Sequence, residues 1–276
     1  MIEHWKSITM LVDIEGDGLG TGFLIRLAFN DPDGMTRPLW FIVTNKHVLG
    51  EALHKKRTIF LYPSIGPTGQ QMRDVVEISS RGNDGRPVIF GHRCADVDIA
   101  LIDVTSLVIS NTLIVHEALS PDAFYYPKNV VPGDLHVEPG MRVCIIGYPS
   151  YEDGDGRVDL QHTEPTICSG TVASSLDSAL VENGRERPGF LINATIIPGH
   201  SGSPVILDPR EPRVIDGKHY LGQTMPPLLL GVMTETRFGK VKPTLSDGRE
   251  AKAFGGLAFA FGAETIAQVL RDPVPY

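Results

Sequence analysis

Short apolar runs separated by turn residues dominate the chain. Runs of this length, rich in β-branched and aromatic residues and bounded by Gly, Pro, Asn and Asp, predict β-strands. Helical periodicity is confined to a short turn after His47 and to residues 263–271, which Pro273 ends. The pattern therefore predicts an all-β protein with a short C-terminal helix. The expected strands are 7–13, 20–29, 39–44, 58–62, 74–79, 87–90, 98–104, 141–147, 167–173, 189–193, 203–207, 228–234 and 256–261.

A proline-containing stretch divides these strands into two groups. Residues 119–139 contain several prolines and few periodic apolar positions, so we interpret them as a connection. Residues 1–118 then form a first unit, and residues 140–276 form a second unit that ends in the helix. The chain has 276 residues, which is enough for two small barrels that share a core.

A serine between glycines follows the apolar run 191–197. Residues 198–204 read PGHSGSP, with the serine at position 201. Glycine lets consecutive backbone N–H groups point at one spot, where they can hold the negative oxygen that forms when a carbonyl is attacked. A serine hydroxyl is a poor nucleophile without an adjacent base. The motif therefore calls for a histidine and a carboxylate elsewhere in the chain.

Both partners stand at the ends of predicted strands. His47 follows the apolar strand 39–44, and Asp98 opens the strand 98–104. Asp96 lies two residues earlier on the same strand face and is the alternative acid, although Asp98 directly abuts the apolar run. A carboxylate in such a place can orient an imidazole and stabilise its positive charge. The serine comes last in the chain, and Ser203 stands where a glycine would complete a Gly-x-Ser-x-Gly elbow, so an α/β-hydrolase is excluded.

Seven short motifs in this order resemble the trypsin-like (chymotrypsin-fold) serine peptidases, closest to the HtrA/Deg-type protease domain. The resemblance implies two antiparallel six-stranded β-barrels, with His47 and Asp98 on the first and Ser201 on the second. The catalytic groups would meet in the cleft between the barrels. The motifs are GTGFLI (20–25), VTNKHV (43–48), DIALI (98–102), IIGYP (145–149), SGTV (169–172), IPGHSGSP (197–204) and GLAFAF (256–261).

The resemblance also implies the chemistry. His47, Asp98 and Ser201 would form a catalytic triad that hydrolyses peptide bonds of a protein or peptide substrate through an acyl-enzyme. The backbone N–H groups of Gly199 and Ser201, with His200 between them, would form the oxyanion hole. We expect His200 to shape this turn and not to act as the base, because neighbouring side chains in a tight turn diverge.

Substrate-binding residues follow from the same resemblance. Thr195, six residues before the nucleophile, would form the floor of the S1 pocket, and Val232, Met233 and Thr234 would form the edge strand that pairs with the substrate. A neutral floor favours small or medium apolar residues at the cleaved position. Glu235, which follows these three residues in the sequence, weakens the expected preference.

Three departures from the family pattern leave alternatives open. His200 stands where digestive enzymes carry an aspartate that pairs with a cleaved N-terminus, so activation of that kind is not expected. Ser203 replaces a glycine that is usual in HtrA-type enzymes, and no PDZ-like domain is expected after the helix. One alternative is a non-catalytic trypsin-like module that binds a peptide or protein. Another is a peptidase that stays latent until an activating protein partner or an oligomer orders the nucleophile loop.

Charge and cysteine content limit the remaining functions. The formal net charge of −8 argues against general binding to nucleic acid or anionic membranes. Residues 1–15 lack the apolar core of a signal peptide, and no apolar stretch approaches the roughly 20 residues that span a bilayer. Three cysteines cannot all pair and fit no zinc spacing, so we expect free thiols, a cytoplasmic location, and neither a metal nor another cofactor. They are Cys94, Cys144 and Cys168.

Overall fold

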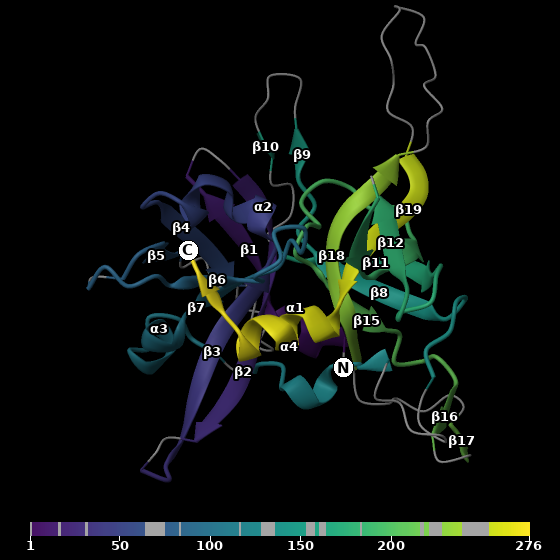
Figure 1. Cartoon of the computed structure of the whole chain (residues 1–276), viewed down its shortest axis with the longest axis horizontal. Coiled ribbons are helices and arrows are strands. Elements are labelled where there is room, and N and C mark those ends of the chain that lie inside the picture. Colours follow the sequence, from purple (N-terminus) through teal and green to yellow (C-terminus); the bar gives the residue numbers. More distant parts are fainter. Residues whose placement is uncertain are drawn as a thin grey trace, which may run out of the picture.

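Strands make up most of the ordered structure (Figure 1). The computed structural model describes residues 2–15, 18–30, 33–63, 75–82, 84–115, 117–127, 136–152, 158–159, 164–182, 184–215, 218–220, 228–238 and 254–276. The helices in these ranges are short: α1 (Ile2–Ile8), α2 (Lys46–Leu49), α3 (Thr105–Ile109) and α4 (Ala263–Arg271). Two 3₁₀ turns, Gly50–Leu53 and Pro121–Ala123, complete the helical structure described. The predicted all-β class is confirmed, and α4 covers the range predicted for the closing helix.

The first half of the chain forms a curved, eight-stranded antiparallel sheet. Its order is β20-β6-β7-β3-β2-β1-β4-β5. The strands are β1 (Thr9–Ile14), β2 (Gly18–Asn30), β3 (Thr36–Thr44), β4 (Thr58–Pro63), β5 (Val76–Ser79), β6 (Ile89–Gly91), β7 (Ala100–Asp103) and β20 (Val274–Pro275). Residue 74, expected as the first residue of a strand, lies outside the described residues.

This sheet corrects the prediction of a closed six-stranded first barrel. Among the described residues, β5 and β6 do not pair with each other, and one isolated bridge, between Arg81 and Pro87, forms in the segment that joins them. Proline has no N–H to donate, so the ladder does not extend through Pro87. One edge of β6 pairs with β7, and the remaining edge, which would close a barrel, pairs with β20 from the far end of the chain. The result is a half-barrel.

The second half forms the closed six-stranded barrel that was predicted, in the order β11-β14-β19-β18-β15-β8. Its strands are β8 (Arg142–Gly147), β11 (Thr166–Val172), β14 (Phe190–Asn193), β15 (Pro204–Leu207), β18 (Leu228–Phe238) and β19 (Phe254–Gly262). Three short hairpins project from it: β9 (Tyr151–Glu152) with β10 (Val158–Asp159), β12 (Ala179–Glu182) with β13 (Arg185–Pro188), and β16 (Arg213–Ile215) with β17 (Lys218–Tyr220).

Buried side chains on both faces of β8 join the two halves. Val143 and Ile145 point into the barrel core, whereas Cys144 and Ile146 belong to the cluster that fills the first sheet. Successive side chains of a strand face opposite sides. Residues 143–146 of this strand are all apolar because both faces are buried there. The shared core fixes the first sheet against the barrel and thereby fixes residues carried by one half relative to residues carried by the other.

The segment between the halves forms one bridge to each of them. Leu119 bridges to Ile25 of β2, and Phe124 bridges to Leu229 of β18. Residues 128–135 of the predicted connection lie outside the described residues. After β19, helix α4 leads the chain back to the first sheet, where β20 ends beside β6 (Figure 1). None of the helices in the described ranges has the length and apolar character needed to cross a membrane.

Candidate active site

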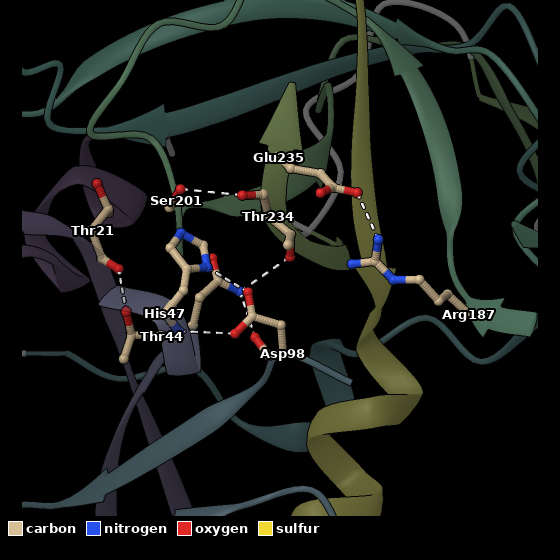
Figure 2. A network of polar contacts seen from close by, with 9 residues as sticks. Thr21, Thr44, His47, Asp98, Arg187, Ser201, Thr234 and Glu235 are labelled. Atoms are coloured by element: carbon tan, nitrogen blue, oxygen red, sulfur yellow. Dashed lines mark hydrogen bonds and ion pairs between the residues drawn. The ribbon is translucent and has the colours of Figure 1, made fainter. Parts of the chain in front are cut away.

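Two oxygens of one carboxylate hold His47. The residue lies in α2, one turn of helix that begins immediately after β3, and Asp98 lies in the loop before β7. Asp98 Oδ2 is 2.5 Å from His47 Nδ1, and Asp98 Oδ1 accepts the backbone N–H of His47 at 3.0 Å (Figure 2). The Asp98 side chain is 19% exposed and the His47 side chain is 50% exposed. The carboxylate is therefore shielded while the imidazole remains open to solvent.

Asp96, the alternative acid, lies elsewhere. Its carboxylate faces Arg185 of β13 at 3.2 Å, and both side chains are substantially exposed. The geometry therefore places Asp98, and not Asp96, against the imidazole.

Ser201 lies in the tight turn between β14 and β15, on the opposite half of the molecule. Its Oγ donates to the carbonyl oxygen of Thr234 at 3.1 Å. In Figure 2 the imidazole edge that does not meet Asp98 points toward Ser201. Within the described ranges, the side-chain hydrogen bond of His47 goes to Asp98, and none joins His47 to Ser201. The three residues thus come from both halves to one place, with the serine hydroxyl turned toward β18.

Thr234 occupies a bulge that also ties the halves together. The ladder between β18 and β19 shifts register between Met233 and Glu235, which leaves Thr234 outside the regular pairing. Its hydroxyl accepts a hydrogen bond from Asn45 Nδ2 at 3.1 Å. The same Asn45 amide donates to the Asp98 carbonyl at 2.7 Å. The fully buried Asn45 therefore connects the loop of Asp98 to the strand that contacts Ser201.

Three consecutive carbonyl groups of the serine turn (residues 198–204) are each held by a separate donor. The hydrogen bonds are Ser150 N–H to Pro198 O at 2.9 Å, Thr21 Oγ1–H to Gly199 O at 2.7 Å and Ser203 N–H to His200 O at 3.0 Å. The C=O and N–H of a trans peptide point in opposite directions, so these bonds also set the directions of the three following N–H groups. Among the described residues, the N–H groups of Gly199 and Ser201 find no acceptor.

Two glycines make this turn possible. Gly199 and Gly202 have φ of +90° and +86°, in the region that side chains other than glycine rarely adopt. A Cβ on Gly199 would lie 2.1 Å from the carbonyl oxygen of Tyr148, and one on Gly202 would lie 1.9 Å from that of Thr21. The Gly-x-x-Gly spacing in the sequence is therefore a requirement of the turn.

Thr21 of β2 is a site residue whose role the sequence did not identify. Its N–H donates to the Ser201 carbonyl at 2.8 Å, and its hydroxyl accepts the Tyr148 N–H at 3.0 Å while donating to Gly199. The flanking glycines were the available signal, because a Cβ on Gly20 would lie 3.0 Å from the Ser201 carbonyl oxygen. Glycines within a strand often mark a close approach of another backbone.

His200, next to Ser201 in the serine turn, is fully buried. Its Nε2 lies 3.5 Å from Cys168 Sγ, and its Nδ1 lies 3.5 Å from Ser203 Oγ. Burial lowers the pKa of His200 to about 4. The imidazole is therefore neutral at pH 7 and packs between the turn and Cys168.

The four residues expected to bind substrate differ in their burial and backbone pairing. Val232 is buried and pairs with Pro204. Met233 is also buried, and its N–H and C=O already bond to Ser203 and Gly202 of the serine turn. The pairing between β15 and β18 ends at Val232, so the edge of β18 opens at Thr234. Thr195 is exposed in the segment after β14.

A charged groove of about 820 Å³ lies beside His47. Arg187 of β13 packs its guanidinium over the rings of Phe259 and Phe261, at 4.9 and 5.4 Å from their centroids, and pairs with Glu235 at 2.8 Å. The polar sequence of β13 gave no sign of this role. Six of the residues that line the groove are Lys46, His47, Asp96, Asp98, Arg185 and Arg187. No group of three metal-ligating side chains comes together in the part of the chain that the structure describes.

The family model described as trypsin-like peptidase domain matches residues 20–215. The chain belongs to this family. The match covers His47, Asp98 and Ser201 and confirms the trypsin-like part of the resemblance seen in the motifs. No curated protein matches the chain.

Solved structures are similar to this chain at low sequence identity. The protease domain of MamO from Magnetospirillum magneticum, in its apo form, is 13% identical, with 99% of this chain and 100% of that chain covered and a TM-score of 0.52. The inactive form of the Rv3671c protease of M. tuberculosis is 15% identical, with 98% and 91% covered and a TM-score of 0.48. At such identities the likeness to MamO shows the fold alone.

Proposed function

We propose that this chain is a serine endopeptidase that hydrolyses protein or peptide substrates through His47, Asp98 and Ser201. The observation that carries the proposal is that both Asp98 carboxylate oxygens bind His47, one at its backbone N–H and one at Nδ1. The chain is a trypsin-like peptidase domain, and its glycine-bounded turn brings Ser201 to the same site. A carboxylate bonded to Nδ1 leaves Nε2 as the nitrogen that can accept a proton from a nucleophile.

In the proposed mechanism, Ser201 rotates from the Thr234 carbonyl toward His47 and attacks the substrate carbonyl. His47 takes the hydroxyl proton, Asp98 stabilises the resulting imidazolium, and His47 then protonates the leaving amine. Water hydrolyses the acyl-enzyme by the same route. The N–H groups of Gly199 and Ser201 stabilise the oxyanion, since the held carbonyls of the turn keep them fixed before reaction.

Substrate binding itself favours the rotation of Ser201. A peptide that pairs with the open edge of β18 would donate an N–H to the Thr234 carbonyl, which is the acceptor that Ser201 Oγ uses in the free protein. Competition for this acceptor would release the hydroxyl. On this account an activating partner is not needed to shape the turn.

A proteolysis assay tests the proposal directly. Purified protein is incubated with an unfolded protein substrate, beside Ser201→Ala and His47→Ala, and the fragments are sequenced by mass spectrometry. We expect cleavage by the wild type and a loss of several orders of magnitude in both variants. Binding without cleavage by all three proteins would favour the non-catalytic binding module instead.

The same fragments test the proposed specificity. With Thr195 as a neutral pocket floor, cleavage is expected after small or medium apolar residues. Cleavage confined to Arg and Lys would contradict this assignment of Thr195.

We also propose a cytoplasmic location. The support is chemical: Cys94, Cys144 and Cys168 are all free, as expected in a reducing compartment. Compartment fractionation of the source cells tests this location.

A further inference from the structure

Three consecutive residues each bind the segment that carries Asp98. Asn45 donates to the Asp98 carbonyl, and His47 is held by the Asp98 carboxylate. Between them, Lys46 Nζ donates to the carbonyls of His92 at 2.9 Å and Cys94 at 3.3 Å. The Lys46 side chain therefore spans from the helix of His47 to the beginning of the loop that ends at Asp98.

Lys46 is an unusual residue to find in this place because it is only 8% exposed. Burying an ammonium is costly unless the charge is compensated. In the described part of the chain no carboxylate pairs with its Nζ, and the two carbonyl oxygens supply only part of the compensation.

The ring of Tyr276 also compensates the buried charge of Lys46. Lys46 Nζ lies 5.6 Å from the centroid of this ring, within the range of a cation–π interaction. Tyr276 is held by two contacts. Its backbone N–H donates to the Ile89 carbonyl at 3.0 Å, and the His54 ring packs edge-on against its ring with centroids 6.1 Å apart. Strand β20, directly before it, pairs with β6.

Gly91 of β6 leaves the space in which lysine and tyrosine meet. A Cβ there would lie 2.4 Å from Tyr276 Cε2 and 2.9 Å from Lys46 Cε. Residues 46, 91 and 276 therefore converge behind the His47–Asp98 pair, although they are far apart in the sequence.

We infer that Lys46 and Tyr276 are positioning residues for the His47–Asp98 pair. Lys46 ties the Asp98 loop to the helix of His47, and Tyr276 covers the ammonium and keeps it between the two carbonyls. The inference rests on the proposed function, because it assigns these residues a part in aligning the base of that reaction. A misplacement of the order of 1 Å in such a pair costs up to about a hundredfold in rate.

Two pairs of substitutions separate positioning from general stability. Lys46→Met keeps the aliphatic stem and removes the ammonium, and Lys46→Arg restores a cationic donor. Tyr276→Leu removes the aromatic ring, and Tyr276→Phe keeps it. Lys56→Met, at an exposed lysine of the same half, is the matched control.

Two readouts are measured well below the thermal midpoint of each variant. The first is kcat and KM on a cleaved peptide. The second is long-range ¹H–¹⁵N NMR of the His47 imidazole, assigned with His47→Gln, which reports the ring nitrogen that carries the proton.

We expect Lys46→Met to lower kcat by about tenfold to a hundredfold with KM within about twofold, and to mix the two His47 tautomers. Tyr276→Leu should move both readouts in the same direction, whereas Lys46→Arg, Tyr276→Phe and Lys56→Met should stay near wild type.

A Lys46→Met protein with wild-type kcat and an unmixed tautomer would overturn the inference, even if its thermal midpoint were lower. The NMR readout needs no turnover. A wild type without peptidase activity would therefore contradict the proposed function, while the tautomer in Lys46→Met would still decide whether Lys46 positions His47.

Discussion

The Thr21 hydroxyl donates a 2.7 Å hydrogen bond to the carbonyl of Gly199, which is 178 residues later in the chain. This bond joins a strand of the first sheet to the serine turn of the barrel. The same hydroxyl accepts the N–H of Tyr148, so it has both a fixed donor and a fixed acceptor. The shape of the serine turn therefore depends on the contact between the two halves.

Replacing Thr21 with valine should lower kcat/KM by roughly tenfold to a hundredfold, below the 10²–10³ loss that follows removal of a direct oxyanion donor. Valine keeps the volume and loses both hydrogen bonds. Kinetics on a cleaved peptide measure the effect, with Thr58→Val of β4 as the control. Equal kinetics for Thr21→Val and Thr58→Val would show that the turn holds its shape without Thr21.

Asp98→Asn should reduce kcat by about 10⁴, because an amide cannot hold the Nδ1–H tautomer or stabilise the imidazolium. Asp96→Asn is the matched control and should stay within about twofold of wild type, since it removes only an exposed ion pair with Arg185. The reverse pattern in these two variants would assign the acid to Asp96.

Gly202→Ala and Gly34→Ala should differ strongly in stability. Both glycines have positive φ, +86° and +80°, so alanine costs about 1–2 kcal/mol of backbone strain at either position. A Cβ at Gly202 would also lie 1.9 Å from the Thr21 carbonyl oxygen, whereas Gly34 has nothing within 4 Å. Urea unfolding should show an additional loss of about 1–3 kcal/mol for Gly202→Ala. Equal losses would mean that the turn relaxes away from Thr21.

The free energy of unfolding should fall as the pH is lowered from about 6.5 to about 4. In this window the unfolded chain protonates His200, while burial keeps the folded imidazole neutral because its pKa is lowered from 6.5 to about 4. The unfolded state then binds more protons, so acid destabilises the folded state, by about 3 kcal/mol over the window. Above pH 6.5 this group contributes no pH dependence.

Urea unfolding of His200→Gln against wild type isolates this contribution. The variant should lose that part of the slope, whereas His136→Gln, at an exposed histidine, should keep it. An unchanged slope in His200→Gln would mean that His200 is protonated in the folded protein at the same pH as in the unfolded chain.

Apolar runs predicted the strands of both halves because each of these strands packs at least one face into the core. The helix at 263–271 was predicted for the same reason, since Ile266 and Val269 lie in the core. Elements without such a pattern were missed. Among the described residues, the β12–β13 hairpin pairs only with itself, and β20 has two residues, one of them proline.

Individual site residues were predictable where a motif gave their order, and not where burial alone gives them their role. His47 and Asp98 come together as the order of motifs suggested. Lys46 was not predictable, because nothing in a local sequence says that a lysine is covered by a tyrosine 230 positions away. Val232 and Met233 were assigned to substrate from a motif, yet their backbones are already paired within the chain.

Labelling with a fluorophosphonate probe tests the central claim most directly, because only a serine activated by a base reacts rapidly with it. The wild type, Ser201→Ala and His47→Ala are treated in parallel, and the adduct is located by mass spectrometry. We predict one adduct on Ser201 of the wild type and none in either variant. A folded wild type that takes up no label, or that is labelled at another serine, would contradict the claim that Ser201 is the nucleophile of a serine peptidase.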